Sequence, residues 1–236
     1  ADDSLMSIAK EPGRDVLWLG TRDGGIHRFD IEKETFQRFP VGTAAGLAAR
    51  SSCITVAKDG TVWAGTFGDG LHRLAGDGKT FERFLDESSP ARNNILGIQE
   101  DAGGQLWLAT NRGLSRFDPK KRTFRPFDSK DGLLSEFTFG ASGKGRDGTL
   151  YFGGIRGFNA IEPGKLKDNP HAPPVYVTGF RKFNRDVRLG RDITTLKELP
   201  LSHADNVISF DFAALDFTAP ARNRYRVMLE GFDPAF

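Results

Sequence analysis

The 236-residue sequence is poor in the side chains that most often carry chemistry: it has one cysteine, four histidines and two methionines. The single cysteine, Cys53, cannot form an internal disulfide, and it fits a small buried side chain at the start of a strand. No His-x-x-His or Cys-x-x-Cys pair offers the spacing of metal ligands. We therefore expect neither a metal site nor a cofactor.

Long hydrophobic runs and an excess of one charge are also missing. No segment approaches the ~20 apolar residues of a membrane span, and the acidic start, Ala1-Asp2-Asp3, is not followed by the apolar core of a signal peptide. The 33 basic and 31 acidic residues leave a net charge of +2, which predicts no nucleic-acid partner and no membrane contact in this segment. We expect any secretion signal or anchor of the parent protein to lie outside it.

Glycine and phenylalanine are abundant, with 28 and 20 residues, and they fall into a repeat. The four copies are marked by an aromatic residue at spacings of 45, 44 and 44 (63−18, 107−63 and 151−107), namely Trp18, Trp63, Trp107 and Tyr151. Glycine turns such as Asp69-Gly70 separate short alternating strands, because glycine adopts positive φ without strain. Four antiparallel strands in a period of ~40–45 residues indicate a β-propeller blade. We expect Trp18, Trp63 and Trp107 to pack between neighbouring blades.

The repeats lie near residues 15–39, 60–84, 104–127 and 148–163, so we assign 1–166 to propeller blades and 167–236 to a linker and a second domain. Residues 162–174 are rich in proline, lysine and asparagine, as in linkers. Beyond them, apolar and polar residues alternate as in one buried face of a sandwich. The predicted strands there are Val175–Phe183, Leu199–Leu201, Val207–Phe217 and Arg224–Glu230.

The third copy, from Ile98 to Asp118, reads Ile-x-x-Asp-x-x-Gly-x-Leu-Trp-x-x-Thr-x-x-Gly-Leu-x-Arg-Phe-Asp. This pattern resembles the two-component regulator propeller repeat, and the fourth copy, 147–158, is similar to the terminal repeat of that family. Residues 173–180, 207–217 and 223–233 resemble early strands of the three-tyrosine (Y_Y_Y) domain.

The resemblance implies an all-β chain: four blades of a larger, seven-bladed propeller, followed by a partial immunoglobulin-like β-sandwich. It also implies the periplasmic, ligand-sensing part of a membrane-anchored bacterial receptor, a hybrid histidine kinase of a two-component system or a diguanylate cyclase. Such a region is not an enzyme, binds a small molecule or oligosaccharide, and relays signals through the sandwich. Homodimerisation would then occur through the receptor.

Two other functions stay open: a propeller enzyme of the streptogramin-lyase type, and a protein-binding scaffold. The enzyme needs a cluster of histidine and acid around a metal, which the sequence does not assemble. His27 and His72 share one repeat position, and we interpret this as a tolerant strand position, since Ser115 and Asn159 occupy it elsewhere. The recurring turn acids Asp59, Asp101 and Asp147 are expected to hydrogen-bond their own backbone.

Propellers bind ligands at one end, where the loop between strands two and three meets the linker to the next blade. Arginine in these segments suits a carboxylate or sulfate of a ligand, although acids such as Asp23, Asp69 and Asp86 share them and allow solvated loop charge instead. The candidate ligand-binding residues are Arg22, Arg50, Arg92, Asn93, Asn94, Arg112 and Arg156.

Overall fold

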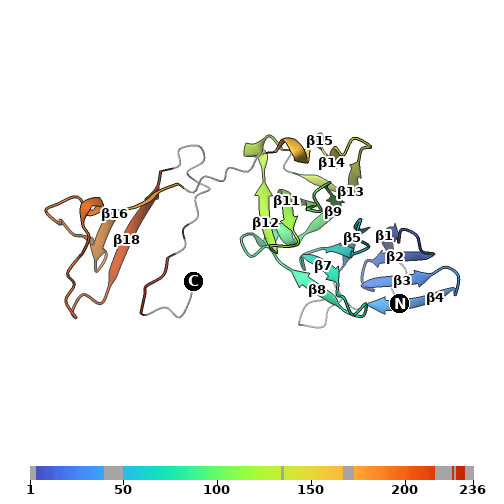
Figure 1. Cartoon of the computed structure of the whole chain (residues 1–236), viewed down its shortest axis with the longest axis horizontal. Coiled ribbons are helices and arrows are strands. Elements are labelled where there is room, and N and C mark those ends of the chain that lie inside the picture. Colours follow the sequence, from blue (N-terminus) through green and yellow to red (C-terminus); the bar gives the residue numbers. More distant parts are fainter. Residues whose placement is uncertain are drawn as a thin grey trace. The chain divides into compact units, whose positions relative to one another are not determined.

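A computed structural model describes residues 4–39, 50–133, 136–166, 173–215, 225 and 227–231. The chain divides into two compact units, unit 1 (residues 1–167) and unit 2 (residues 168–236). In the described ranges every regular element is a β-strand or a short 3₁₀ turn (Figure 1). None of the helical segments in these ranges is long or apolar enough to cross a membrane.

Unit 1 holds four antiparallel sheets, each with its strands in chain order. Blade 1 comprises β1 (Leu5–Lys10), β2 (Val16–Thr21), β3 (Ile26–Asp30) and β4 (Thr35–Phe39). Blade 2 comprises β5 (Ser51–Val56), β6 (Val62–Thr66), β7 (Leu71–Leu74) and β8 (Phe81–Phe84). Blade 3 comprises β9 (Ile95–Glu100), β10 (Leu106–Thr110), β11 (Gly113–Asp118) and β12 (Thr123–Phe127). Blade 4 comprises β13 (Phe137–Lys144), β14 (Leu150–Gly154) and β15 (Gly157–Ile161).

Short 3₁₀ turns lie between or after the blades: η1 (Pro90–Asn93), η2 (Ser129–Asp131) and η3 (Pro163–Lys165). Residues 40–49, between β4 and β5, lie outside the described residues, as do 134–135 and 167–172. The strand β1 was not among the predicted strands. It pairs with β2 across a turn that contains Pro12 and Gly13, which differs from the Asp-Gly turns of the later copies.

The glycine turns have the conformation that the repeat requires. Gly70 and Gly113 have φ values of +79° and +87°. A Cβ on either glycine would strike a backbone carbonyl of the blade's own outer strand, Phe84 O or Phe127 O. Only glycine adopts a positive φ without strain and also leaves room for the carbonyl oxygen. These turns therefore fix the hairpins at the same place in successive copies.

The marker tryptophans pack between blades, as the repeat predicted. Trp18, Trp63 and Trp107 are 2%, 3% and 0% exposed. Trp63 of blade 2 makes an edge contact with Phe117 of blade 3, with ring centroids 5.8 Å apart. The burial of these large rings contributes to the hydrophobic core of each blade boundary.

The first strands of successive blades, β1, β5, β9 and β13, lie next to one another at the centre of unit 1 (Figure 1). Small residues allow this close approach. A Cβ on Gly20 would lie 2.6 Å from Ser51 Oγ, and one on Gly97 would lie 2.7 Å from Ser142 Oγ. Sheets radiating from such a centre are the architecture of a β-propeller.

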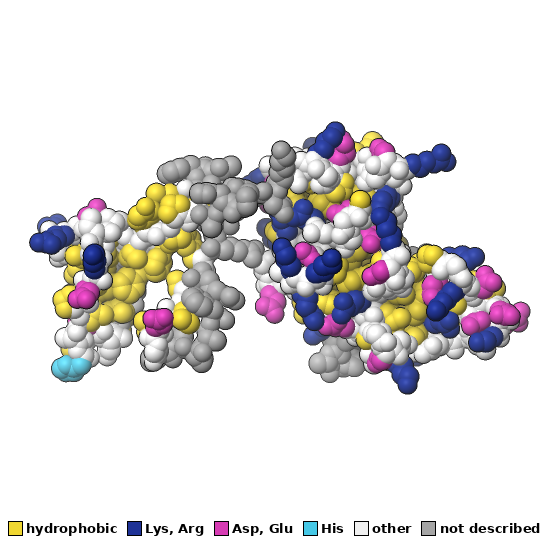
Figure 2. All heavy atoms as spheres, in the orientation of Figure 1, with side chains coloured by type: hydrophobic (Ala, Val, Ile, Leu, Met, Phe, Trp, Pro, Cys, Tyr) yellow, Lys and Arg dark blue, Asp and Glu magenta, His cyan; other side chains and the backbone are white. Residues whose placement is uncertain are grey.

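Unit 2 contains one sheet in its described residues, with β17 (Arg185–Asp186), β16 (Val175–Lys182) and β18 (Ile208–Ala214) in that order, and a 3₁₀ turn η4 (Ile193–Thr195). Phe180 is buried, and Phe210 and Phe212 beside it are 40% and 37% exposed. Figure 2 shows hydrophobic side chains gathered over this unit. The described residues thus form one layer, and the immunoglobulin-like sandwich stays a prediction.

Two strand predictions in unit 2 need correction. The strand predicted at Leu199–Leu201 is wrong, because this segment pairs with no strand, and Pro200 at its centre has no N–H for a ladder. In the strand predicted at 224–230, Arg224 and Arg226 lie outside the described residues, and 225 and 227–229 are not in a strand. Instead, the Tyr225 hydroxyl accepts a hydrogen bond of 2.8 Å from the backbone N–H of Ala214, at the end of β18. Residues 216 and 217 of the predicted third strand also lie outside the described ranges.

Candidate functional site

The candidate binding residues lie at one end of the blades. In a four-stranded meander the loop between the second and third strands and the linkers to neighbouring blades share one end, which we call the loop end. Arg22, Arg112 and Arg156 lie in the β2–β3, β10–β11 and β14–β15 loops, and all three are exposed. They project from the loops of three different blades.

Asn93 fixes the linker between blades 2 and 3. Its backbone carbonyl accepts hydrogen bonds from Gly68 N (3.2 Å) and Gly70 N (3.1 Å), which tie η1 to the β6–β7 loop. Its side-chain oxygen accepts a bond of 2.8 Å from the backbone N–H of Asp86. The residue is 8% exposed, so the structure gives Asn93 a positioning role.

Arg92 also turns inward. Its side chain is 12% exposed and its Nη1 lies 3.9 Å from Asp86 Oδ2. Among the described residues, neither Arg92 Nε nor Asp86 Oδ2 has a hydrogen-bond partner, although both atoms are buried. The guanidinium therefore faces a carboxylate of its own linker.

Arg50 and Asn94 lie at the surface of the loop end. Arg50 Nε lies 3.3 Å from Asp23 Oδ1, and both side chains are more than half exposed. The Arg50 carbonyl accepts a hydrogen bond of 3.0 Å from the backbone N–H of Phe67. The Asn94 amide oxygen lies beside Gly68, the residue after Phe67. The structure thus brings the Arg50 backbone and the Asn94 side chain to the same loop, next to Phe67 and Gly68.

Phe67 itself was not a candidate, yet it forms the most distinctive contact at this end. Its ring stacks on that of Phe139, with centroids 6.1 Å apart and planes inclined by 24°. Phe67 belongs to blade 2 and Phe139 to blade 4, so the pair, which we call the aromatic bridge, spans the inner strand of blade 3. Phe67 is 38% exposed. The sequence carried a signal for Phe67, because the other copies have arginine, asparagine or isoleucine at this repeat position.

A buried polar network lies behind this loop. His72 Nε2 lies 3.1 Å from Asp69 Oδ2, and Arg83 Nη1 lies 2.7 Å from Asp69 Oδ1. Burial lowers the pKa of His72, and the neighbouring Asp69 offsets part of that effect. The equivalent His27 faces Gly24 instead of an acid. The two histidines therefore share a strand position without sharing partners, and in the described ranges no three His, Cys, Asp or Glu residues come together in a metal-binding arrangement.

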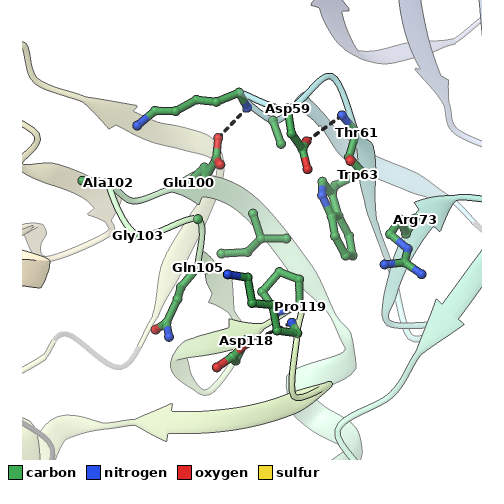
Figure 3. A pocket seen from close by; sticks show the side chains of 15 residues that line it. Asp59, Thr61, Trp63, Arg73, Glu100, Ala102, Gly103, Gln105, Asp118 and Pro119 are labelled. Atoms are coloured by element: carbon green, nitrogen blue, oxygen red, sulfur yellow. Dashed lines mark hydrogen bonds between the residues drawn. The ribbon is translucent and has the colours of Figure 1, made fainter.

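A hollow lies at the opposite end, between blades 2 and 3 (Figure 3). Its volume is about 650 Å³. Its polar groups serve the turns that form it, since Asp59 Oδ1 accepts from Thr61 N and Glu100 Oε2 accepts from Lys58 N, each at 2.8 Å. Asp101 and Asp147 bond their own turns in the same way, which confirms the turn interpretation of these acids. Smaller equivalents of about 430 and 340 Å³ occur at the other blade boundaries, so the hollow is a consequence of the repeat.

Sequence comparison finds a relative among signalling proteins. No protein-family model matches the chain. Over 152 residues the chain is 30% identical to histidine kinase P4 of Formosa agariphila. That match covers 61% of this chain and 11% of the relative.

Structure comparison finds propellers. The extracellular domain of the putative hybrid two-component system BT3049 from B. thetaiotaomicron matches with a TM-score of 0.64 and 24% identity, over 92% of this chain and 30% of that one. A streptogramin B lyase matches with a TM-score of 0.57 and 19% identity, over 72% of this chain and 55% of that one. These likenesses show the β-propeller fold, and the chain spans less than a third of the matched extracellular domain.

Proposed function

We propose that this chain is the ligand-sensing region of a bacterial signal-transduction receptor and that it binds a small molecule or oligosaccharide at the loop end of unit 1. One observation carries the proposal. A partly exposed aromatic bridge, the Asn94 amide and the backbone of Arg50 meet at the β6–β7 loop, and the Arg50 guanidinium pairs with Asp23 of the neighbouring blade at the same end. The resemblance to a histidine kinase and to a sensor's extracellular domain supports the same function.

The chemistry of this group of residues favours a ligand with both a ring face and an anionic or hydroxyl group. Phe67 offers part of a π-face, on which a sugar ring or another flat ring packs. Arg50 adds a guanidinium fork suited to a carboxylate or sulfate, and Asn94 adds an amide that can donate and accept. Because Asn93 and two loop N–H groups hold η1 in place, little ordering is needed on binding.

The wider setting is part of the proposal. A membrane-anchored parent would place this region outside the cytoplasm, in the periplasm, and unit 2 would pass the ligand-bound state toward a kinase or cyclase domain. The enzymatic alternative draws on the likeness to streptogramin B lyase. It predicts conversion of a ligand instead of reversible binding.

Thermal-shift and calorimetric titration with neutral and uronate-containing oligosaccharides test the proposal. Arg50→Ala, Asn94→Ala and Phe67→Ala should each weaken a binder by roughly 5- to 30-fold, about 1–2 kcal/mol. Lys120→Ala, on the exposed β11–β12 turn at the other end, is the matched control. Binding unaffected by all three loop-end variants would disprove the site, and chromatographic detection of product would favour the enzyme.

A further inference from the structure

The first strand of every blade has a β-bulge at the loop end. In β5, Ser51 and Cys53 pair with consecutive residues of β6, so Ser52 between them has no partner in the ladder. The register shifts at the equivalent place in β1 and β9. A bulge bends its strand and re-aims a side chain, and bulges are frequent beside functional sites. The repeat therefore places one bulge of each blade around the loop end of the propeller axis.

The bulge of blade 4 is larger than the others. In β13 four residues, 138–141, lie opposite Gly153 alone. Within this segment Gly140 has a φ of +68°, and a Cβ there would meet nothing within 4 Å. The residue before it, Phe139, stacks on Phe67 in the aromatic bridge. The enlarged bulge thus places one ring of the bridge and an open space on consecutive residues.

The bulges border a hollow of about 330 Å³, which we call the axis hollow. Every residue that lines it belongs to the first strand of a blade, and Met6, Ser52 and Gly140 come from three of the bulges. The volume is at the lower end of the range for ligand pockets, roughly 300–1,000 Å³. Blades surround a central channel in propellers of any blade number. Further blades would therefore add to the wall of the axis hollow and leave these strands facing the axis.

The side chains of the axis hollow are uncharged. Among the residues that line it none is acidic or basic, and its polar side chains are hydroxyls, such as that of Thr55, and one amide, that of Gln99. Gln99 Nε2 donates a hydrogen bond of 3.1 Å to Ser142 Oγ, from blade 3 to blade 4. The amide oxygen of Gln99 can still accept a hydrogen bond, and the hydroxyl of Ser142 can still donate one.

The backbone adds further hydrogen-bonding groups. Each first strand is the edge strand of its sheet, so one row of its N–H and C=O groups points away from the sheet. A hydroxyl group already uses this row, because Ser52 Oγ donates to the backbone carbonyl of Ile95 in the next first strand. The axis hollow therefore suits a ligand with many hydroxyl groups and no charge.

We propose that the axis hollow takes a neutral hexose unit of the oligosaccharide that binds at the loop end. This inference rests on the proposed function and names the part of the ligand that enters the propeller. An ionised unit would lose its hydration in the axis hollow without gaining a counter-charge, so an acidic unit stays outside, beside Arg50. The hydroxyls of a neutral unit pair with Thr55, Gln99 and the free strand edges, while the rest of the ligand packs on the aromatic bridge.

Calorimetric titration of the full chain with oligosaccharides of two to four neutral hexose or uronate units tests the axis hollow. Thr55→Phe fills it and should weaken the tightest of these binders by about tenfold or more. Thr55→Val keeps the size of the side chain and removes one hydroxyl, so it should weaken the same binder roughly 3- to 10-fold. Thr123→Phe and Thr123→Val, at an exposed position of the outer strand β12, are matched controls and should leave the affinity unchanged. Circular dichroism checks that each variant is folded.

The composition of the binder is a second measurement. Oligomers made only of uronate should bind about tenfold or more weakly than oligomers with a neutral end unit, because no uncharged unit is then available to enter. Wild-type affinity in both Thr55 variants, while Phe67→Ala and Arg50→Ala weaken the same binder, overturns this inference and leaves the loop-end site standing. Tightest binding of the all-uronate oligomers overturns the neutral unit. If none of the oligosaccharides binds the wild-type chain, the proposed function fails and this inference fails with it.

Discussion

Gly65 and Cys53 face each other on the paired strands β6 and β5, and a Cβ added to Gly65 would lie 2.6 Å from the cysteine sulfur. The same Cβ would lie 2.6 Å from Cγ2 of Ile95, in the first strand of the next blade. In blade 3 the glycine lies on the first strand instead of the second, because Gly97 of β9 pairs with Ala109 of β10. Each of these strand pairs therefore combines one glycine with one larger residue, which keeps the inner strands of adjacent blades in contact.

Gly65→Ala is expected to destabilise the protein by about 1–3 kcal/mol, because overpacking between a buried sulfur and a buried isoleucine forces strands apart. Equilibrium denaturation in guanidinium chloride measures the change. Gly143→Ala is the matched control. Gly143 also lies in a strand, but a Cβ there meets nothing within 4 Å, so its free energy of unfolding should change by less than about 0.5 kcal/mol. Equal losses in the two variants would contradict the close approach.

Trp107→Ala should cost far more than Tyr151→Ala, although the residues share a repeat position. Trp107 is fully buried, stacks on Phe127 at 5.1 Å and donates its indole N–H to Asp101. Its truncation should remove about 3–5 kcal/mol, whereas Tyr151 is 39% exposed and should lose roughly 1 kcal/mol or less. Equilibrium denaturation of the two variants measures both losses. Similar losses at both positions would contradict the exposure of Tyr151.

Most strands and turns of unit 1 were predictable, because the same residue types recur at the same positions in successive copies. Trp63 and Gly70 fix a strand and a turn in one blade, and their equivalents fix the others. The errors arose where the copies differ. A turn at Pro12-Gly13 hid β1, and Pro200 lay inside an apolar triplet that resembled a strand but cannot donate to a ladder.

The loop end was predictable only in part. The repeat placed these arginines and asparagines at one end of the blades, in agreement with the strand order of each sheet, and ligand binding at that end stays a prediction. Their local sequence did not show that Asn93 and Arg92 point into their own linker toward Asp86. Phe67 differs from its repeat equivalents in the sequence, but its contact with Phe139 was out of reach. The two residues come from copies two apart, so their contact depends on how three blades are arranged and not on any one repeat.

Cys53 should be unreactive in the folded protein. Burial raises the pKa of its thiol to about 12, so almost no thiolate, the reactive form, is present near neutral pH. Ellman's reagent should therefore label less than one thiol per chain under native conditions and one per chain in denaturant. Rapid labelling of the native protein, at the rate seen in denaturant, would contradict the burial of this strand.

The buried His72 should make the protein less stable in mild acid. Burial holds the pKa of His72 below its ordinary value of about 6.5, against the partial offset from Asp69, and the charge of Arg83 lowers it further. The unfolded chain therefore binds the proton more tightly than the folded one. The free energy of unfolding should be constant above about pH 7 and should fall as the pH drops below about 6.5, by at most about 1.4 kcal/mol per pH unit for this group. Denaturation curves between pH 8 and 5 measure the slope.

His72→Gln should flatten that slope while lowering stability at pH 8 by about 1 kcal/mol, since the amide retains one polar contact to Asp69 but fits the site less well. Some slope should persist, because burial and the neighbouring Arg38 also lower the pKa of His27. His203→Gln, at an exposed position of unit 2, is the control and should leave the profile unchanged. If the His72→Gln slope equals that of the wild type, the network of Asp69, His72 and Arg83 does not set the acid sensitivity, and the contribution of His27 becomes the next to measure.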